Sequence, residues 1–199
     1  MRVGRRGQTM NLLKFLLAQP ALLWRFLGFF QPPLLRALHA ATVILVIAQF
    51  LTFFWGCSDA HMQLGLAACA AGFSLAVCGL WKRGPGNYFP YMFGDFAQLG
   101  KDFAAIRGGN IHIAPRPRGL ATTVQGLGLG ALVMSLATGF WLYLGWESGD
   151  VTPEALTAHS VFAWLMLAFL AGHGGMALTH FAAWQKNTAK QRARAKGGA

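Results

Sequence analysis

The chain has 199 residues, of which 55% are hydrophobic and only 12% charged, and it carries a net charge of +11. Soluble domains have about 25% charged residues, so this composition excludes an ordinary soluble protein and indicates one that folds in lipid. All 17 Lys and Arg residues fall in three segments. The first extends from the N-terminus to Arg36, the second covers 82–118, and the third follows Trp184. No folded basic domain remains to bind nucleic acid, so that class of protein is excluded too.

The first predicted element is an apolar segment at residues 11–30, which Lys14, Pro20 and Arg25 interrupt. Its charge-free stretches are too short to cross a bilayer, which needs about 20 apolar residues of helix. We therefore predict that the basic N-terminal segment, 1–33, contains an interfacial helix that lies on the membrane surface.

Four apolar runs that follow are long enough to span a membrane. They comprise residues 34–55, 62–81, 120–144 and 156–183. Short loops join the first run to the second and the third to the fourth, so each pair should form an antiparallel helical hairpin. The sequence thus predicts an all-α integral membrane four-helix bundle at 34–185, followed by a basic cytoplasmic tail at 186–199.

The connection between the second and third spans, 82–118, is much longer than the other two loops. Within it, residues 91–107 carry apolar side chains at helical spacing beside charged ones, which predicts a second interfacial helix. His112 lies later in the same basic connection, where we expect it to be solvated.

Charge predicts the orientation in the membrane. The two short loops contain no Lys or Arg and hold four of the six acidic residues: Asp59, Glu147, Asp150 and Glu154. Because cytoplasmic loops carry the excess of Lys and Arg, the three basic segments should lie in the cytoplasm. The prediction is a multi-pass protein of the inner membrane with both termini cytoplasmic and both acidic loops on the outer side.

Five of the six histidines lie within these spans or at their ends: His39, His61, His159, His173 and His180. Ionisable residues are costly in hydrocarbon and are by default functional there. At 1.5 Å per residue, His173 lies about 21 Å deeper than His159, which is at the outer end of the fourth span. Depth therefore pairs His61 with His159 near the outer surface, and His39 with His173 near the inner surface.

The residues around these pairs limit what they can bind. Zinc usually takes four ligands and a di-iron site needs several Glu, yet neither pair has a Cys, Asp or Glu beside it within the membrane. A haem needs only two axial ligands, and two imidazoles leave no open position on the iron, which favours electron transfer. No C-x-x-C-H motif is present for covalent haem attachment. We therefore predict two haems b, one above the other across the membrane.

Other residues are candidates for contacts with the cofactors. Cationic side chains at the inner ends of the spans, Arg36, Arg118 and His180, are possible partners of haem propionates or of a quinone. Small residues in the second, third and fourth spans either leave room for a planar haem or serve ordinary helix packing. In the second span they are Gly65, Ala67, Ala68, Ala70, Ala71 and Gly72, and in the other two they are Gly126, Gly128, Gly130, Gly172, Gly174 and Gly175.

A resemblance to the prokaryotic cytochrome b561 family is carried most specifically by the fourth span, AHSVFAWLMLAFLAGHGGMALTHFAAWQKNT. The family includes the cytochrome b subunits of nickel–iron hydrogenases. Its first and second helices resemble RALHAATVILV, with His39, and AHMQLGLAACAAG, with His61. Its third helix, which bears no ligand, resembles RGLATTVQGLGLGALVMSLATGFWLYLG. The similar region extends over about 34–188.

The resemblance implies two haems b with the same axial pairs, His39 with His173 and His61 with His159. His180 matches a further family histidine that is not an axial ligand. The implied function is electron transfer in a bacterial inner membrane, between the quinone pool and a redox partner. That partner would be a periplasmic cytochrome c or a membrane oxidoreductase of the hydrogenase type.

Two alternatives remain at this point. One is a stand-alone quinone-linked oxidoreductase, such as a superoxide oxidase, although the acidic outer loops would repel the superoxide anion. The other is a non-redox membrane assembly subunit whose histidines bind a metal. A reduced optical spectrum without a b-type α-band would contradict both haem interpretations.

Overall fold

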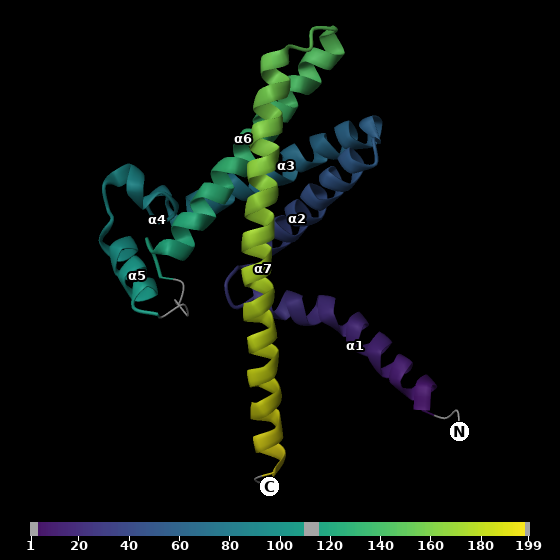
Figure 1. Cartoon of the computed structure of the whole chain (residues 1–199), viewed down its shortest axis with the longest axis vertical. Coiled ribbons are helices and arrows are strands. Elements are labelled where there is room, and N and C mark those ends of the chain that lie inside the picture. The colour runs from purple at the N-terminus through teal and green to yellow at the C-terminus, as the bar shows by residue number, and fades with distance from the viewer. Residues whose placement is uncertain (1–3, 110–115, 198–199) are drawn as a thin grey trace. The chain divides into compact units, whose positions relative to one another are not determined.

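The computed structural model describes the backbone of residues 4–109 and 116–197, so His112 lies outside the described residues. Throughout these two ranges the regular elements are helices and no strand occurs, which confirms the all-α prediction. The elements are α1 (Gly4–Leu27), α2 (Pro33–Phe54), α3 (Ser58–Arg83), α4 (Pro85–Tyr88), the 3₁₀ helix η1 (Pro90–Phe93), α5 (Ala97–Arg107), α6 (Leu120–Ser148) and α7 (Pro153–Gly197) (Figure 1).

Four of the described helices are long and apolar enough to cross a membrane, namely α2, α3, α6 and the part Pro153–Gln191 of α7. They contain the four predicted spans apart from Trp55, and they form two helical hairpins, α2 with α3 and α6 with α7 (Figure 1). Only 6–22% of the most apolar window of each helix is buried inside the protein. The outward apolar side chains are therefore left for lipid, as in a multi-pass membrane protein.

Both α6 and α7 end later than the predicted spans. The third span was expected to end at 144, but α6 continues to Ser148, where Gly149 adopts the left-handed conformation (φ 75°) and ends the helix. The fourth span was expected at 156–183, but α7 is a single helix of 45 residues from Pro153 to Gly197. No Pro lies within α7 after its first residue, so nothing in the local sequence stops the helix where the apolar run ends.

The structure divides into two units, Ala37–Gly175 and a smaller one that combines Met1–Arg36 with Met176–Ala199. In the smaller unit, aromatic side chains join α1 to the end of α7. The ring centroid of Phe26 lies 5.5 Å from that of Phe181 and 5.7 Å from that of Trp184. Gln185 also donates a hydrogen bond to Oε1 of Gln19 (2.7 Å).

The larger unit has a buried core at the middle of its apolar helices. This cluster takes one or two side chains from each of the four helices: Val46, Ala68, Leu132, Leu136 and Met166. The Leu136 side chain fills the space at Gly72 of α3, where a Cβ atom would overlap it. Small residues of α3 thus bring that helix close to α6.

The connection between α3 and α6 is folded, but not as predicted. Instead of one helix over 91–107, η1 ends at Gly94, which is left-handed (φ 68°), and α5 begins only at Ala97. The carboxylate of Asp95, in the turn between them, accepts a hydrogen bond from Nη1 of Arg118 (2.7 Å). This bond, with a weaker one from the Ala97 N–H, holds the pKa of Asp95 below its usual value. The ion pair is therefore fully charged at neutral pH.

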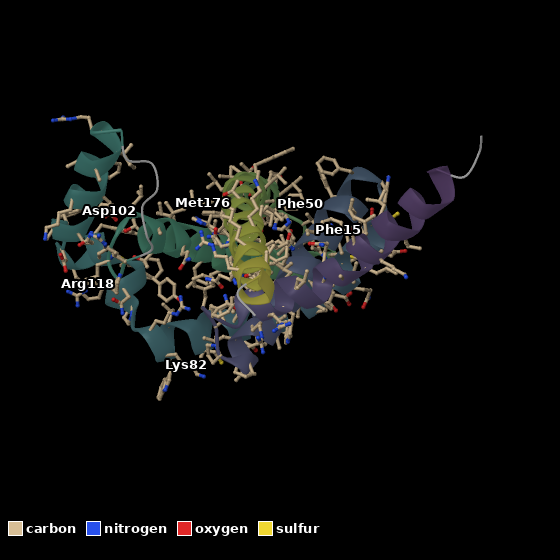
Figure 2. All side chains as sticks on the ribbon, turned by 90° about the horizontal axis from the view of Figure 1, so that it is seen from below. Phe15, Phe50, Lys82, Asp102, Arg118 and Met176 are labelled. Atoms are coloured by element: carbon tan, nitrogen blue, oxygen red, sulfur yellow. The ribbon has the colours of Figure 1, made fainter. Side chains whose placement is uncertain are left out.

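A buried carboxylate attaches α5 to the start of α6. Asp102 is only 3% exposed, and its Oδ2 accepts a hydrogen bond from the backbone N–H of Leu120 (2.8 Å). Its Oδ1 accepts another from Nε2 of Gln98 (2.8 Å). A negative charge at the N-terminus of a helix is favourable because the first N–H groups have no partner within the helix. Figure 2 shows Asp102 and Arg118 in this part of the chain.

We expect Asp102→Ala to lower the free energy of unfolding by about 1–3 kcal/mol, because the Leu120 N–H would lose its acceptor. Thermal unfolding of the detergent-solubilised protein measures the change. Lys101→Ala, one position earlier and exposed, is the matched control and should change stability by less than about 0.5 kcal/mol. Equal losses in the two variants would contradict the role given to the carboxylate.

Candidate functional site

The larger unit brings four of the predicted site residues together as two histidine pairs. His61 of α3 and His159 of α7 have ring centroids 6.3 Å apart, with the ring planes at 79°. His39 of α2 and His173 of α7 have centroids 6.4 Å apart, with the planes at 75°. These are the two pairings that depth alone predicts.

The spacing of both pairs fits one metal ion bound between two imidazoles. A bond of about 2.0–2.1 Å to each ring nitrogen, which itself lies about 1.1 Å from its centroid, separates the centroids by about 6.2–6.4 Å. Among residues 4–109 and 116–197, no group of three or more His, Cys, Asp or Glu could hold a metal ion. Each pair offers two imidazoles, which is the number of axial ligands that a six-coordinate haem takes from the protein.

Backbone and side-chain acceptors on α2 hold the His61 ring. Its Nδ1 lies 3.1 Å from the carbonyl oxygen of Gln49 and 3.3 Å from Oγ1 of Thr52. In return, Nε2 of Gln49 donates a hydrogen bond to the carbonyl of His61 (2.9 Å). A carbonyl only accepts, so Nδ1 carries the proton and Nε2 has the lone pair with which a neutral imidazole can bind a metal.

The His159 ring is held in the same way by α6. Its Nδ1 lies 3.1 Å from the carbonyl oxygen of Ser135 and 3.4 Å from Oγ1 of Thr138. Gly139 provides the space for this ring, since a Cβ atom there would lie 3.0 Å from Cε1 of His159. Both rings of this pair thus have a fixed Nδ1–H and a free Nε2.

The environment of the His39–His173 pair is different. The His173 ring stacks on Phe169, with centroids 5.0 Å apart and planes at 10°. The Phe169 ring in turn fills the space at Gly128 of α6. Nδ1 of His39 and Oγ1 of Thr42 are buried and have no hydrogen-bond partner within the described residues.

Both pairs use α7, and the 14 residues from His159 to His173 correspond to about 21 Å along the helix. Met166 lies halfway between these two histidines and belongs to the buried core of the larger unit. Packed side chains therefore fill the level between the pairs, which makes two separate sites rather than one.

The other three candidate contacts have partners of their own or are exposed. Arg36 and His180 belong to the smaller unit, where Nη1 of Arg36 donates to the Trp24 carbonyl (3.0 Å) and its guanidinium lies over the Trp24 ring. His180 is exposed. Arg118 is in the larger unit, in its ion pair with Asp95. Contacts of Arg36, Arg118 and His180 with haem propionates or with a quinone therefore stay predictions from the sequence.

The predicted small residues have different roles. Gly126 lets the backbone of Tyr88 approach α6, and Gly128 accommodates Phe169, so both serve packing within the protein. A Cβ atom at four other positions, Gly130, Gly172, Gly174 and Gly175, would meet nothing within 4 Å.

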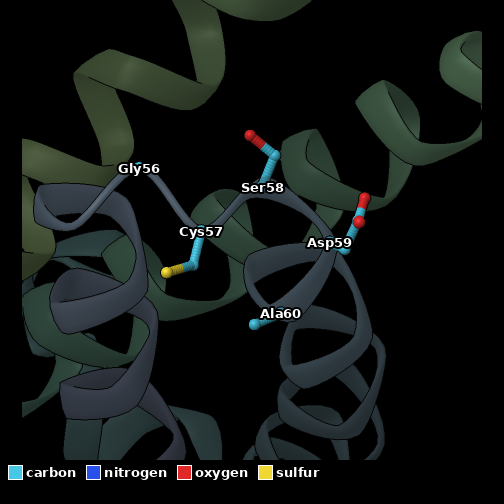
Figure 3. A pocket seen from close by; sticks show the side chains of 5 residues that line it. All are labelled: Gly56, Cys57, Ser58, Asp59 and Ala60. Atoms are coloured by element: carbon cyan, nitrogen blue, oxygen red, sulfur yellow. The ribbon is translucent and has the colours of Figure 1, made fainter.

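A shallow hollow lies at the turn between α2 and α3, lined by residues 56–60 (Figure 3). It exposes the thiol of Cys57 and the carboxylate of Asp59. The backbone N–H of His61 donates to the Cys57 carbonyl (2.9 Å). The hollow therefore belongs to the first turn of the helix that carries His61, and no histidine lines it.

The functional residues that the sequence analysis missed are those that fix the rings: Gln49, Thr52, Ser135, Thr138 and Gly139. A signal for four of them is present in the sequence. Polar residues three positions apart interrupt otherwise apolar runs at 49 and 52 and again at 135 and 138. Polar side chains at membrane depth need a partner, so each repeat indicates a hydrogen-bonded neighbour.

A comparison with known protein families shows which family the chain belongs to. The model of the family described as prokaryotic cytochrome b561 matches residues 31–191. The chain belongs to this family. No curated protein and no solved structure matches it. As a member of the cytochrome b561 family, the chain is a membrane protein that binds haem b and transfers electrons.

Proposed function

We propose that this member of the cytochrome b561 family binds two haems b and conducts electrons across the membrane between the quinone pool and a redox partner. One haem is held by His61 and His159 and the other by His39 and His173. When bound, each haem supplies an iron that takes up and releases one electron without an open coordination position.

The observation that carries the proposal is the pair of centroid distances, 6.3 Å and 6.4 Å, in two separate places of one unit. Each pair takes its histidines from two different helices, so the protein must be folded before either site exists. The fixed Nδ1–H groups of His61 and His159 support it, because histidine ligands generally donate this proton to a carbonyl or carboxylate.

The charge pattern supports an orientation and a class of partner. The four acidic residues at the outer turns, Asp59, Glu147 and Glu154 in the terminal turns of α3, α6 and α7 and Asp150 in the loop between α6 and α7, are all exposed. With the basic segments in the cytoplasm, the His61–His159 site is the outer one, next to these turns. A negative outer surface favours a partner with a positive one, and such an encounter slows as salt is raised. We propose a periplasmic cytochrome c or a hydrogenase-type membrane oxidoreductase.

The quinone end is proposed on the inner side, where Arg36, Arg118 and His180 are the candidate contacts for a quinone or for haem propionates. The basic segments there also face anionic lipid headgroups, which would hold α1 and α5 at the surface. We further propose that these two helices are interfacial, since α5 exposes Phe103 at 55% beside Lys101 and Arg107.

The first test is the stoichiometry and type of haem. Purified protein should show a b-type α-band on dithionite reduction and contain two non-covalent haems per chain by pyridine haemochrome assay. One haem per chain would contradict the two-site proposal, and none would contradict the proposal altogether. In vesicles, electrons should then pass between an external cytochrome c and the quinone pool, and loss of either haem should stop this transfer. Quinone reduction by superoxide alone would instead favour a stand-alone oxidoreductase.

A further inference from the structure

The histidines of the His61–His159 pair meet the same arrangement of atoms on two different helices. On α2, the carbonyl of Gln49 and the hydroxyl of Thr52 face the His61 ring. On α6, the carbonyl of Ser135 and the hydroxyl of Thr138 face the His159 ring. In each case the threonine follows the residue that supplies the carbonyl by three positions.

Each threonine hydroxyl already uses its own proton within its helix. Thr52 donates to the carbonyls of Ala48 (2.9 Å) and Gln49 (3.0 Å). Thr138 donates to the corresponding carbonyls of Met134 (2.7 Å) and Ser135 (3.2 Å). Toward the imidazole each hydroxyl can therefore only accept, and it adds a second acceptor to the carbonyl.

The same threonines also influence where that carbonyl points. A Thr side chain that bonds a carbonyl of the preceding turn bends a helix slightly. Back-bonding by itself is ordinary, since Thr188 of α7 also donates to a carbonyl four residues earlier (Trp184, 2.9 Å). What distinguishes Thr52 and Thr138 is that each faces the Nδ1 of a paired histidine.

The His39–His173 pair has no such arrangement. Nδ1 of His39 has no partner in the described part of the chain, and neither has the hydroxyl of Thr42, three residues further along α2. His173 rests against the apolar face of Phe169. The two sites thus differ in how strongly the histidine protons are hydrogen-bonded.

We propose that Thr52 and Thr138 are positioning residues that fix the Nδ1–H hydrogen bonds of His61 and His159 and so give this site the lower reduction potential. The proposal rests on the proposed function, in that it requires a haem at each pair. A histidine whose Nδ1–H is strongly bonded is a more basic ligand, and a more basic ligand stabilises ferric over ferrous iron. Electrons entering at the His61–His159 site would then move downhill to the His39–His173 site.

The experiment is a potentiometric titration of purified, haem-loaded protein, followed at the α-band. The His173→Ala variant, which retains only the His61–His159 haem, assigns the two midpoints. We expect the lower midpoint to belong to that haem. Thr52→Val and Thr138→Val should each shift the ferric–ferrous equilibrium of this haem toward ferrous iron by up to about tenfold. This corresponds to a rise of its midpoint potential by up to about 59 mV for one electron. The other midpoint should not move.

Two controls separate this role from a structural one. Thr52→Ser and Thr138→Ser keep the hydroxyl and should keep the wild-type midpoints. Thr42→Val makes the same isosteric change on α2 beside the other pair and should leave the lower midpoint unchanged. If a valine variant loses its haem, the alanine variant at the same position is titrated instead.

The outcomes distinguish this inference from the proposed function. If both haems are present but valine leaves the lower midpoint in place, or moves both midpoints equally, the inference is overturned and the two-haem proposal stands. It is also overturned if the His61–His159 haem has the higher midpoint. If wild-type protein binds no haem at this pair, both proposals fail together.

Discussion

Alanine at His61 or at His159 removes the same haem, and alanine at His39 or at His173 removes the other. Each variant should fall from two haems per chain to one, because the site loses one of the two imidazoles that lie 6.3–6.4 Å apart and the alanine that replaces it offers the iron no ligand. Pyridine haemochrome assay gives the number of haems, and the low-temperature α-band shows which one is left.

The control for these four variants is His180→Ala. His180 lies on α7 seven residues beyond His173, is exposed and is not one of the paired rings. As a candidate propionate or quinone contact rather than an iron ligand, it should leave both haems bound when it is replaced. The double variants sharpen the test. His61→Ala with His159→Ala should still contain one haem, whereas His61→Ala with His173→Ala should contain none. The reverse result would show that the rings are paired differently.

The two histidine pairs could be predicted from the sequence because, in a helix that crosses a membrane, the position of a residue along the chain determines its depth. Helices must cross the bilayer, their direction alternates, and the rise per residue is fixed, so position along the chain converts to depth. His61 and His159 begin spans that run in the same direction, which places them at one level without knowledge of any contact.

The same reasoning could not predict which residues surround the histidine rings. Depth does not give rotation about the helix axis, so it cannot tell that Thr52 and Thr138 face the histidines. The role of Gly139 depends on how closely α6 approaches α7 there, since a Cβ atom at this position would lie only 3.0 Å from Cε1 of His159. Such contacts are set by packing between helices that are distant in sequence.

The connection between α3 and α6 shows a different limit. Periodicity indicated a helix over 91–107, but the left-handed Gly94 and the Asp95–Arg118 ion pair divide the segment. Asp102 had been counted among the charges of a surface helix, whereas the structure buries it against the N-terminus of α6. A carboxylate that accepts backbone N–H groups can be buried where its neighbours in sequence are solvated.

The glycines of α6 provide a way to remove either haem without touching a histidine. At Gly139, a Cβ atom would lie 3.0 Å from Cε1 and 3.2 Å from Nδ1 of His159, and valine adds two further methyl groups. We expect Gly139→Val to displace this ring from its hydrogen bond with Ser135 and to empty the His61–His159 site. The haem of the other pair should remain, with its midpoint unchanged.

Gly128→Val should have the opposite selectivity. The Phe169 ring occupies the space at Gly128, and the same ring stacks on His173 at 5.0 Å. Valine there would push Phe169 toward His173, at a cost of about 1–3 kcal/mol for overpacking, and we expect loss of the His39–His173 haem. Haem content and the remaining α-band identify the site that is emptied, as in the histidine variants.

Leu127→Val is the control, since Leu127 lies on the same helix and its side chain is 57% exposed. It should retain both haems. If all three valine variants lose haem alike, the effect is general destabilisation of α6. If Gly128→Val and Gly139→Val instead empty opposite sites, the two haems depend on separate packing contacts of one helix. The third span, which bears no histidine of either pair, would then act by fixing the two histidine rings of α7.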